Sequence, residues 1–167
     1  MRAAVLLHDV EGDATDQESR YAHHEISAAF ARKVLSTKGW PEEKIDAVVH
    51  CILAHRFRRG ESTKTVEAQV VFDADKLDAI GAIGVARAVA YATQAGEPFY
   101  TEPSAQFVES GERQPGEAHS AYHEFIFKLR NIKKRMYTPT GKAIAEQRDR
   151  AMAVYFEQLK AEIQGER

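Results

Sequence analysis

Apolar residues recur at helical spacing along most of the chain, and the strict alternation typical of β-strands is almost absent. Between residues 22 and 37, for example, Ile26, Phe30 and Val34 follow one another on one broad helical face, together with Ala31 and Leu35. The same spacing predicts further helices over 41–55, 66–95, 120–136 and 139–164, and an apolar helix over 3–10. The pattern therefore predicts an all-α protein.

Glycine and proline interrupt this pattern at two places. Gly81 and Gly84 fall inside the Ala-rich segment 66–95, where glycine costs helix stability, so we expect them to permit a close helix–helix or helix–ligand approach. The segment 96–119 contains three prolines and is predicted to be a loop, long enough to act as a flap or lid. No linker divides the chain, so we expect residues 1–167 to form one helical domain.

The amino-acid composition indicates which kinds of partner and which cellular compartment to expect. The 167 residues carry 23 Lys and Arg against 25 Asp and Glu, a net charge of −2, which argues against binding to a nucleic-acid polymer. One cysteine, Cys51, rules out an internal disulfide and is typical of a reducing compartment. No apolar run is long enough to span a membrane. We therefore expect a cytoplasmic protein that does not bind membranes.

Seven histidines are the first candidates for chemistry. The pair His8-Asp9 ends the apolar N-terminal helix, where two polar groups need partners or solvent. His23 is predicted at the centre of the apolar stripe of its helix, with His24 at the edge, and His55 is also predicted to point inward. For His8-Asp9 a helix end that meets solvent is the alternative, and a histidine placed as His23 is more often a hydrogen-bonded core residue than a ligand. The remaining ones are predicted to be exposed: His50, His119 and His123.

Three carboxylates lie within the apolar segment 66–95. Asp75 and Asp78 are three residues apart and share a predicted helical face, whereas Asp73 points to another side. Buried carboxylates need cations, which a divalent metal could supply. A structural network with Lys76, Arg87 or a helix cap would satisfy them equally well.

Two segments resemble the HD superfamily of metal-dependent phosphohydrolases: Leu6-Leu7-His8-Asp9-Val10, and the segment from Asp73 to Arg87, which reads DADKLDAIGAIGVAR. The resemblance implies an all-α helical bundle of the HD-domain type. It implies that His8, Asp9 and Asp75 are ligands of one divalent ion, which could be Mn, Mg, Fe, Ni or Zn. The metal site is then expected to be built from segments 8–9, 23–55 and 73–78.

The same resemblance implies hydrolysis of a phosphoester or phosphoanhydride, with a nucleotide or a similar small phosphorylated molecule as substrate. Asp78 is expected to orient water, and His23 and His55 to stabilise phosphoryl charge or to protonate the leaving oxygen. Residues expected to bind the substrate are Lys76, Lys128, Arg148 and His24. For Lys128 a solvated helix face is the alternative, and for Arg148 a buried ion pair.

Two other functions remain open from the sequence: a non-catalytic HD-like module that binds a ligand or a partner, and an oxygenase that uses two irons, as rarer relatives do. The family pattern also has a histidine ligand on a helix before the His-Asp pair, and no histidine precedes His8 in this sequence. We therefore expect weak metal binding and self-association through the N-terminal helix, because its apolar face lacks a cover.

Overall fold

The computed structural model describes residues 1–10, 17–56 and 62–166. These residues form α-helices and one 3-10 helix, with no strand among them, so the all-α fold class is confirmed. The chain divides into two compact units, residues 1–75 and 76–167. Each unit has its own set of packed helices, and the expectation of one helical domain over 1–167 stays a prediction.

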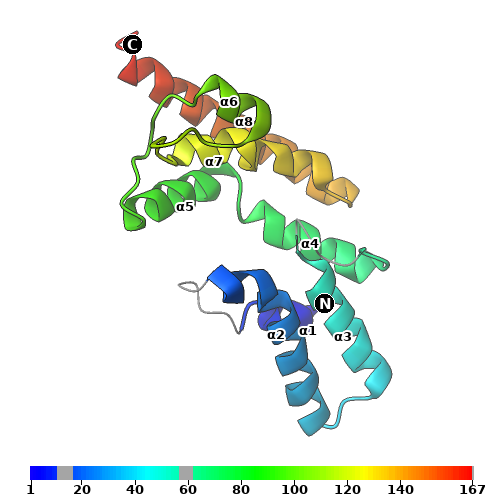
Figure 1. Ribbon diagram of the computed structural model, residues 1–167. Helices are drawn as coiled ribbons and strands as arrows, with labels where there is room; N and C mark the ends of the chain where they lie inside the picture. The colour runs from blue at the N-terminus through cyan, green and yellow to red at the C-terminus, as the bar shows by residue number, and fades with distance from the viewer. Residues whose placement is uncertain (11–16, 57–61, 167) are drawn as a thin grey trace. The chain divides into compact units, whose positions relative to one another are not determined.

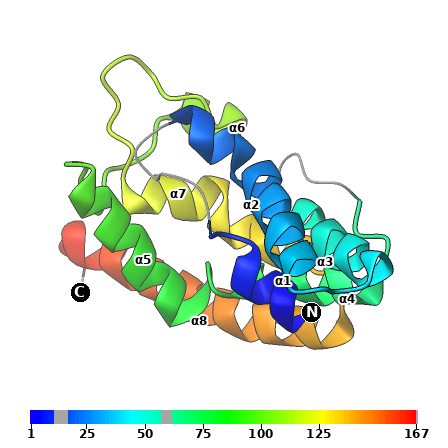
Figure 2. The ribbon, with the colours of Figure 1, turned by 90° about the horizontal axis from the view of Figure 1, so that it is seen from below.

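The first unit holds the helices that carry most of the candidate ligands. They are α1 (Arg2–Leu7), α2 (Gln17–Thr37), α3 (Glu42–Ala54) and all but the last two residues of α4 (Val66–Leu77). Helices α2 and α3 run side by side and are joined by a short turn (Figures 1 and 2). Gly39 in this turn has a φ of 71°, a left-handed conformation that favours glycine after a helix end. The predicted break between the two helices is therefore confirmed.

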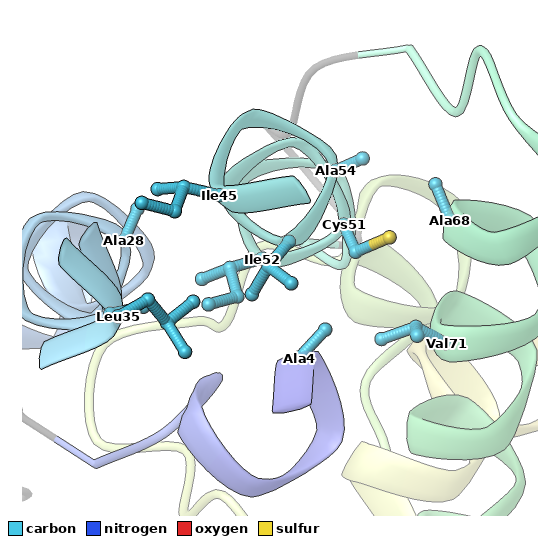
Figure 3. Packing of buried hydrophobic residues seen from close by; sticks show 11 residues of the cluster. Ala4, Ala28, Leu35, Ile45, Cys51, Ile52, Ala54, Ala68 and Val71 are labelled. Atoms are coloured by element: carbon cyan, nitrogen blue, oxygen red, sulfur yellow. The ribbon is translucent and has the colours of Figure 1, made fainter. Parts of the chain in front are cut away.

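The core of the first unit is built largely from small and β-branched side chains. Ile45 and Ile52 of α3 are 1% and 0% exposed, and they face Leu35 and Ala28 of α2 and Ala4 of α1 (Figure 3). Full burial of an isoleucine side chain contributes about 1.5–3 kcal/mol. This packing fixes the end of α1 against α2 and α3, and so fixes the chain at His8 and Asp9.

The inward face of α2 differs from the predicted stripe. Ala31 and Leu35 are buried as predicted, and Ala28 is buried as well, but Ile26 is 40% exposed. Small residues are buried here because they let neighbouring helices approach closely, whereas a helical wheel gives weight to large apolar residues. The shift also buries His24, at 7% exposure, in place of His23.

The second unit packs a long C-terminal helix against a shorter one. Its elements are α5 (Gly81–Gln94), α6 (Ala105–Ser110), α7 (Ala121–Phe127), the 3-10 helix η1 (Leu129–Arg135) and α8 (Pro139–Ile163). A Cβ atom on Gly81 would lie 2.9 Å from the Arg148 side chain, and one on Gly84 would lie 3.1 Å from Met152. Both partners are on α8, so the predicted close approach at these glycines is confirmed.

Several predicted boundaries shift. The segment 66–95 forms two helices that are separated between Leu77 and Gly81, and the expected loop 96–119 contains α6. The expected exposure of His123 is wrong, because its side chain is 0% exposed. Its ring packs 4.5 Å from the ring of Phe107 on α6, within the segment predicted to be only loop. His123 was predicted to be exposed because the helix that covers it, α6, was not predicted.

Candidate metal centre

His8 and Asp9 directly follow the short helix α1. The Nδ1 atom of His8 donates a hydrogen bond to the carbonyl oxygen of Val5 at 2.8 Å, so its other ring nitrogen, Nε2, is turned toward carboxylates. Nε2 lies 3.5 Å from Oδ2 of Asp9 and 3.7 Å from Oδ1 of Asp75, which comes from α4. Two of the carboxylates that the sequence predicted as ligands thus meet at one histidine.

Two further histidines reach the same aspartate from different helices. The Nε2 atoms of His23, on α2, and His55, at the end of α3, lie 3.6 Å and 3.7 Å from Oδ1 of Asp9. His55 donates its Nδ1 proton to the carbonyl oxygen of Ile52 at 2.5 Å. Its Nε2 therefore faces Asp9 with a lone pair in the neutral ring. Metal-binding histidines are commonly held in one tautomer by such a hydrogen bond from the other ring nitrogen.

The spacing of these atoms favours a shared cation over direct hydrogen bonds. A hydrogen bond between nitrogen and oxygen is about 2.7–3.2 Å long, shorter than every one of these separations. Ligand atoms bound at about 2.0–2.2 Å to one ion stand about 3–3.5 Å apart. Donor atoms of Asp9, His23 and His55 all lie within 4.8 Å of one another. This donor set fits a divalent metal ion.

Burial differs across the cluster. The side chain of His55 is 3% exposed and that of His23 is 28% exposed, whereas that of Asp9 is 58% exposed. The histidines are thus held by the protein, and the carboxylate they surround remains accessible to solvent. An ion bound here could keep positions for water and a ligand, which is the property that separates catalytic from purely structural metal sites.

The charges around His8 favour its protonated form. The carboxylate of Asp75 is the largest influence and outweighs burial, so the pKa of His8 is raised from 6.5 to about 8. The Val5 carbonyl and the charge of Asp9 act in the same direction. Near neutral pH, a metal ion must therefore displace a proton from His8 before it can bind there.

His24 lies beside this cluster, and its pKa is shifted in the direction opposite to that of His8. Its ring centre is 5.7 Å from that of His23, and its Nδ1 atom lies 3.1 Å from Nη1 of Arg56. Burial, together with the positive charge of Arg56, lowers the pKa of His24. Arg56 was not among the residues predicted from the sequence, although its place directly after the inward His55 was a signal for a cation near the site.

The structure brings together five of the residues predicted from the sequence: His8, Asp9, His23, His55 and Asp75. The other predicted residues apart from His24 belong to the second unit. Asp78 accepts a hydrogen bond from Arg87, and Lys128 pairs with Glu124 at 2.5 Å. Arg148 donates to the carbonyl oxygen of Leu77, and Lys76 is half-buried near the end of α4.

A second histidine–carboxylate group lies within the second unit. Glu117 accepts hydrogen bonds from the backbone N–H groups of Ser104 and Gln114 at 2.8 Å and 2.7 Å and from the Ser104 hydroxyl at 2.8 Å. His123 Nε2 lies 3.1 Å from Oε1 of the same carboxylate. The backbone donors, Ser104 first, hold the pKa of Glu117 at about 2. This group ties the segment around α6 to α7.

Comparison with known proteins places these features in a family. Residues 1–80 match the model of the HD domain. The uncharacterized protein YpgQ of Bacillus subtilis strain 168 is 37% identical over 169 residues, which is 99% of this chain and 73% of that protein. None of the helices in the described part of the chain is long and apolar enough to cross a membrane.

Solved structures agree with this match. The crystal structure of B. subtilis YpgQ in complex with ADP has a TM-score of 0.71 at 32% identity, covering 98% of this chain and 76% of that one. An HD-superfamily hydrolase from Bacillus thuringiensis has a TM-score of 0.66 at 29% identity, with 98% and 72% covered. These similarities extend over both units of the chain.

Proposed function

Because this chain belongs to the HD-domain family, we propose that it is a metal-dependent phosphohydrolase that cleaves a phosphoester or phosphoanhydride of a nucleotide or a similar small molecule. The observation that carries the proposal is the position of Asp9. Its carboxylate oxygens lie 3.5–3.7 Å from ring nitrogens of three histidines while its side chain stays 58% exposed. A purely structural ion pair does not require the shared carboxylate to be accessible to solvent, whereas a site that binds a ligand does.

The proposed ligands of a divalent cation are His8, Asp9 and Asp75, with His23 and His55 beside them. Imidazole and carboxylate donors suit Mn, Mg, Fe, Ni or Zn. When bound, such a cation polarises a phosphoryl oxygen and lowers the pKa of a bound water. The protein supplies the fixed orientation, because His8 and His55 are each anchored by a backbone carbonyl three residues earlier.

His23 and His55 are proposed to act on the substrate oxygens. His55 has its Nδ1 proton in the bond to Ile52, so only its Nε2 can exchange a proton with a ligand. His23 is partly open to solvent on the same side of Asp9. A protonated imidazole at either place would stabilise phosphoryl charge or donate its proton to the leaving oxygen.

A nucleotide is the proposed substrate class because the related YpgQ crystallised in complex with ADP. The roles of residues in the second unit remain predictions: Asp78 in orienting water, and Lys76, Lys128 and Arg148 in binding phosphate. Arg148 and Lys128 already have protein partners, which supports a structural part for each beside any contact with substrate.

The proposal is tested by Mn²⁺ titration and by phosphate release from a panel of nucleotides. Asp75→Asn should weaken Mn²⁺ binding by at least about 100-fold and abolish turnover, since loss of a residue that only orients a metal ligand already costs about 10–100-fold. Asp46→Asn is the matched control, because Asp46 is an exposed aspartate on α3 of the same unit, paired with Arg32. It should leave both quantities unchanged.

Two outcomes would contradict the proposal in different ways. Mn²⁺ affinity in Asp75→Asn equal to that of the wild type would remove Asp75 from the ligand set. Tight Mn²⁺ binding without hydrolysis of any nucleotide or generic phosphoester would identify the protein as a ligand-binding module of the same family.

A further inference from the structure

Arg56 is held in place by a buried neighbour of the metal cluster. It follows His55 directly, is half-buried, and its Nη1 atom lies 3.1 Å from Nδ1 of His24. A guanidinium can only donate hydrogen bonds, so Nδ1 of His24 must be the acceptor and its ring proton resides on Nε2. Nε2 in turn lies 3.9 Å from a carboxylate oxygen of Glu25. The orientation of His24 is thereby fixed, and with it one nitrogen of Arg56.

This contact puts a permanent positive charge one side chain away from the cluster. The ring centre of His24 is 5.7 Å from that of His23, which is 5.5 Å from that of His55. His23 and His55 both face Asp9, whereas Arg56 contacts the next ring outward. Arg56 also follows His55 directly in the chain, and Nε2 of His55 lies 3.7 Å from Oδ1 of Asp9. The guanidinium is thus attached one residue from the cluster and anchored on the ring beside it.

A guanidinium in this position is suited to phosphate. Its donors form a planar fork that pairs with two phosphate oxygens, and its charge does not depend on pH in the physiological range. A buried histidine that accepts from one nitrogen also reduces the rotamer freedom that binding would otherwise cost. Geometry and charge thus agree on an anionic ligand.

We infer that Arg56, oriented by His24, binds the phosphoryl group of the substrate next to the one that contacts the metal. The inference rests on the proposed function and makes it more specific, because it predicts a preference for ligands with two linked phosphoryl groups. Arg56 contacts the substrate in this assignment, and His24 is a positioning residue that acts through Arg56.

Calorimetric titration with orthophosphate and with pyrophosphate, at one fixed concentration of free Mn²⁺, separates the two phosphoryl positions. The wild type should bind pyrophosphate at least about tenfold more tightly than orthophosphate. Arg56→Gln should lower the pyrophosphate affinity roughly 10- to 100-fold, the range for a charge-assisted hydrogen bond, and should leave orthophosphate and Mn²⁺ binding within about threefold. Arg56→Lys, which keeps the charge without the fork, should fall between the two proteins.

Arg32→Gln is the matched control for a general loss of positive charge. Arg32 lies on α2 of the same unit and is exposed, with Glu42 and Asp46 as partners. Its replacement should leave both phosphate affinities unchanged. Circular dichroism and thermal unfolding of each variant show whether it is folded.

The role of His24 is tested by rescue. His24→Asn offers an oxygen near the position of Nδ1 and should keep most of the pyrophosphate affinity, whereas His24→Leu should lose it as Arg56→Gln does. The double variant with Arg56→Gln and His24→Leu should be no weaker than Arg56→Gln alone, because both changes remove one interaction.

The outcomes distinguish this inference from the proposed function. If folded Arg56→Gln binds pyrophosphate as the wild type does, or loses pyrophosphate and orthophosphate equally, the assignment of Arg56 is overturned while the phosphohydrolase proposal stands. If the wild type binds no Mn²⁺ and hydrolyses no phosphate compound, the proposed function is overturned and the role of Arg56 with it.

Discussion

The two histidine–carboxylate groups of this protein use the same residue types in opposite ways. In the first unit, Asp9 is approached by three histidine nitrogens at 3.5–3.7 Å, and its side chain is 58% exposed. In the second unit, Glu117 accepts bonds of 2.7–2.8 Å from backbone and hydroxyl donors and faces His123, whose side chain is 0% exposed. One group is open and widely spaced, and the other is closed and tightly bonded.

This difference separates a binding site from a structural joint. Donors at hydrogen-bond distance satisfy a carboxylate fully, so a cation would have to displace them. Ring nitrogens beyond that distance leave room for a cation between them and the carboxylate, and those of His8 and His55 are oriented by a backbone carbonyl on the far side of the ring. Residue type and pKa alone do not make this distinction, because each group contains a member with a shifted pKa, His8 in the first and Glu117 in the second.

The largest effect on Mn²⁺ binding is expected when the central carboxylate of each group is replaced by the corresponding amide. Asp9→Asn removes the carboxylate that three histidines face and should weaken Mn²⁺ binding by at least about 100-fold. Glu117→Gln should leave Mn²⁺ affinity unchanged and lower the thermal midpoint of unfolding instead. Calorimetric Mn²⁺ titration and thermal unfolding of both variants provide the two readouts.

Two results would contradict the assignment of the first group as the metal site and the second as a structural group. A loss of Mn²⁺ binding in Glu117→Gln would show that the second group holds the metal. Unchanged Mn²⁺ binding in a folded Asp9→Asn protein would remove Asp9 from the centre of the proposed site.

A smaller effect is expected from His123, which the second unit buries completely. His123→Leu keeps apolar volume against Phe107 but removes the ring nitrogens that face Glu117 and the buried hydroxyl of Ser120. The free energy of unfolding should fall by about 1–3 kcal/mol, the cost of an unsatisfied buried polar group. Denaturant unfolding measures this, and Mn²⁺ affinity should not change. A variant as stable as the wild type would mean that the network adds nothing to folding.

Sequence periodicity predicted most of the fold because helix formation leaves local signals. Thr138 followed by Pro139 is such a signal for the start of α8, and the Thr138 hydroxyl accepts a hydrogen bond from the N–H of Gly141. Gly81 and Gly84 signalled the close approach of α8. The short helix α6 has capping signals of its own, Ser104 and Gly111, but its six residues carry too few positions for a helical period to appear.

The site was predicted in part, and for two different reasons. The resemblance selected His8, Asp9 and Asp75, which the structure brings together. Helical position indicated His55 correctly but assigned the buried place on α2 to His23, although His24 occupies it. Burial on α2 depends on which neighbouring helix comes closest, and this is a tertiary property that one helix's pattern does not contain. The contact between Arg56 and His24 joins residues 32 positions apart and has no local signal.

The smallest predicted effect is the pH dependence of Mn²⁺ affinity, which arises from His8 in the first group. Its pKa is raised to about 8 in the metal-free protein, chiefly by Asp75, so Mn²⁺ must displace a proton below that pH. Apparent Mn²⁺ affinity should therefore fall about tenfold for each unit of pH below 8, and change little through His8 above it. Calorimetric titrations from pH 6.5 to 9, with His8→Gln beside the wild type, measure the slope.

Stability of the metal-free protein should show the opposite slope. The folded pKa of His8 lies above its unfolded value of 6.5, so its contribution is fully present below about pH 6.5 and is lost as pH rises through 8. The rise in pKa from 6.5 to about 8 corresponds to about 2 kcal/mol. His8→Gln should remove this dependence on pH, whereas His123→Leu should keep it. If the free energy of unfolding depends on pH in the same way in the wild type and in His8→Gln, the Asp75 carboxylate does not raise the pKa of His8. His8 would then not belong to the group around Asp9.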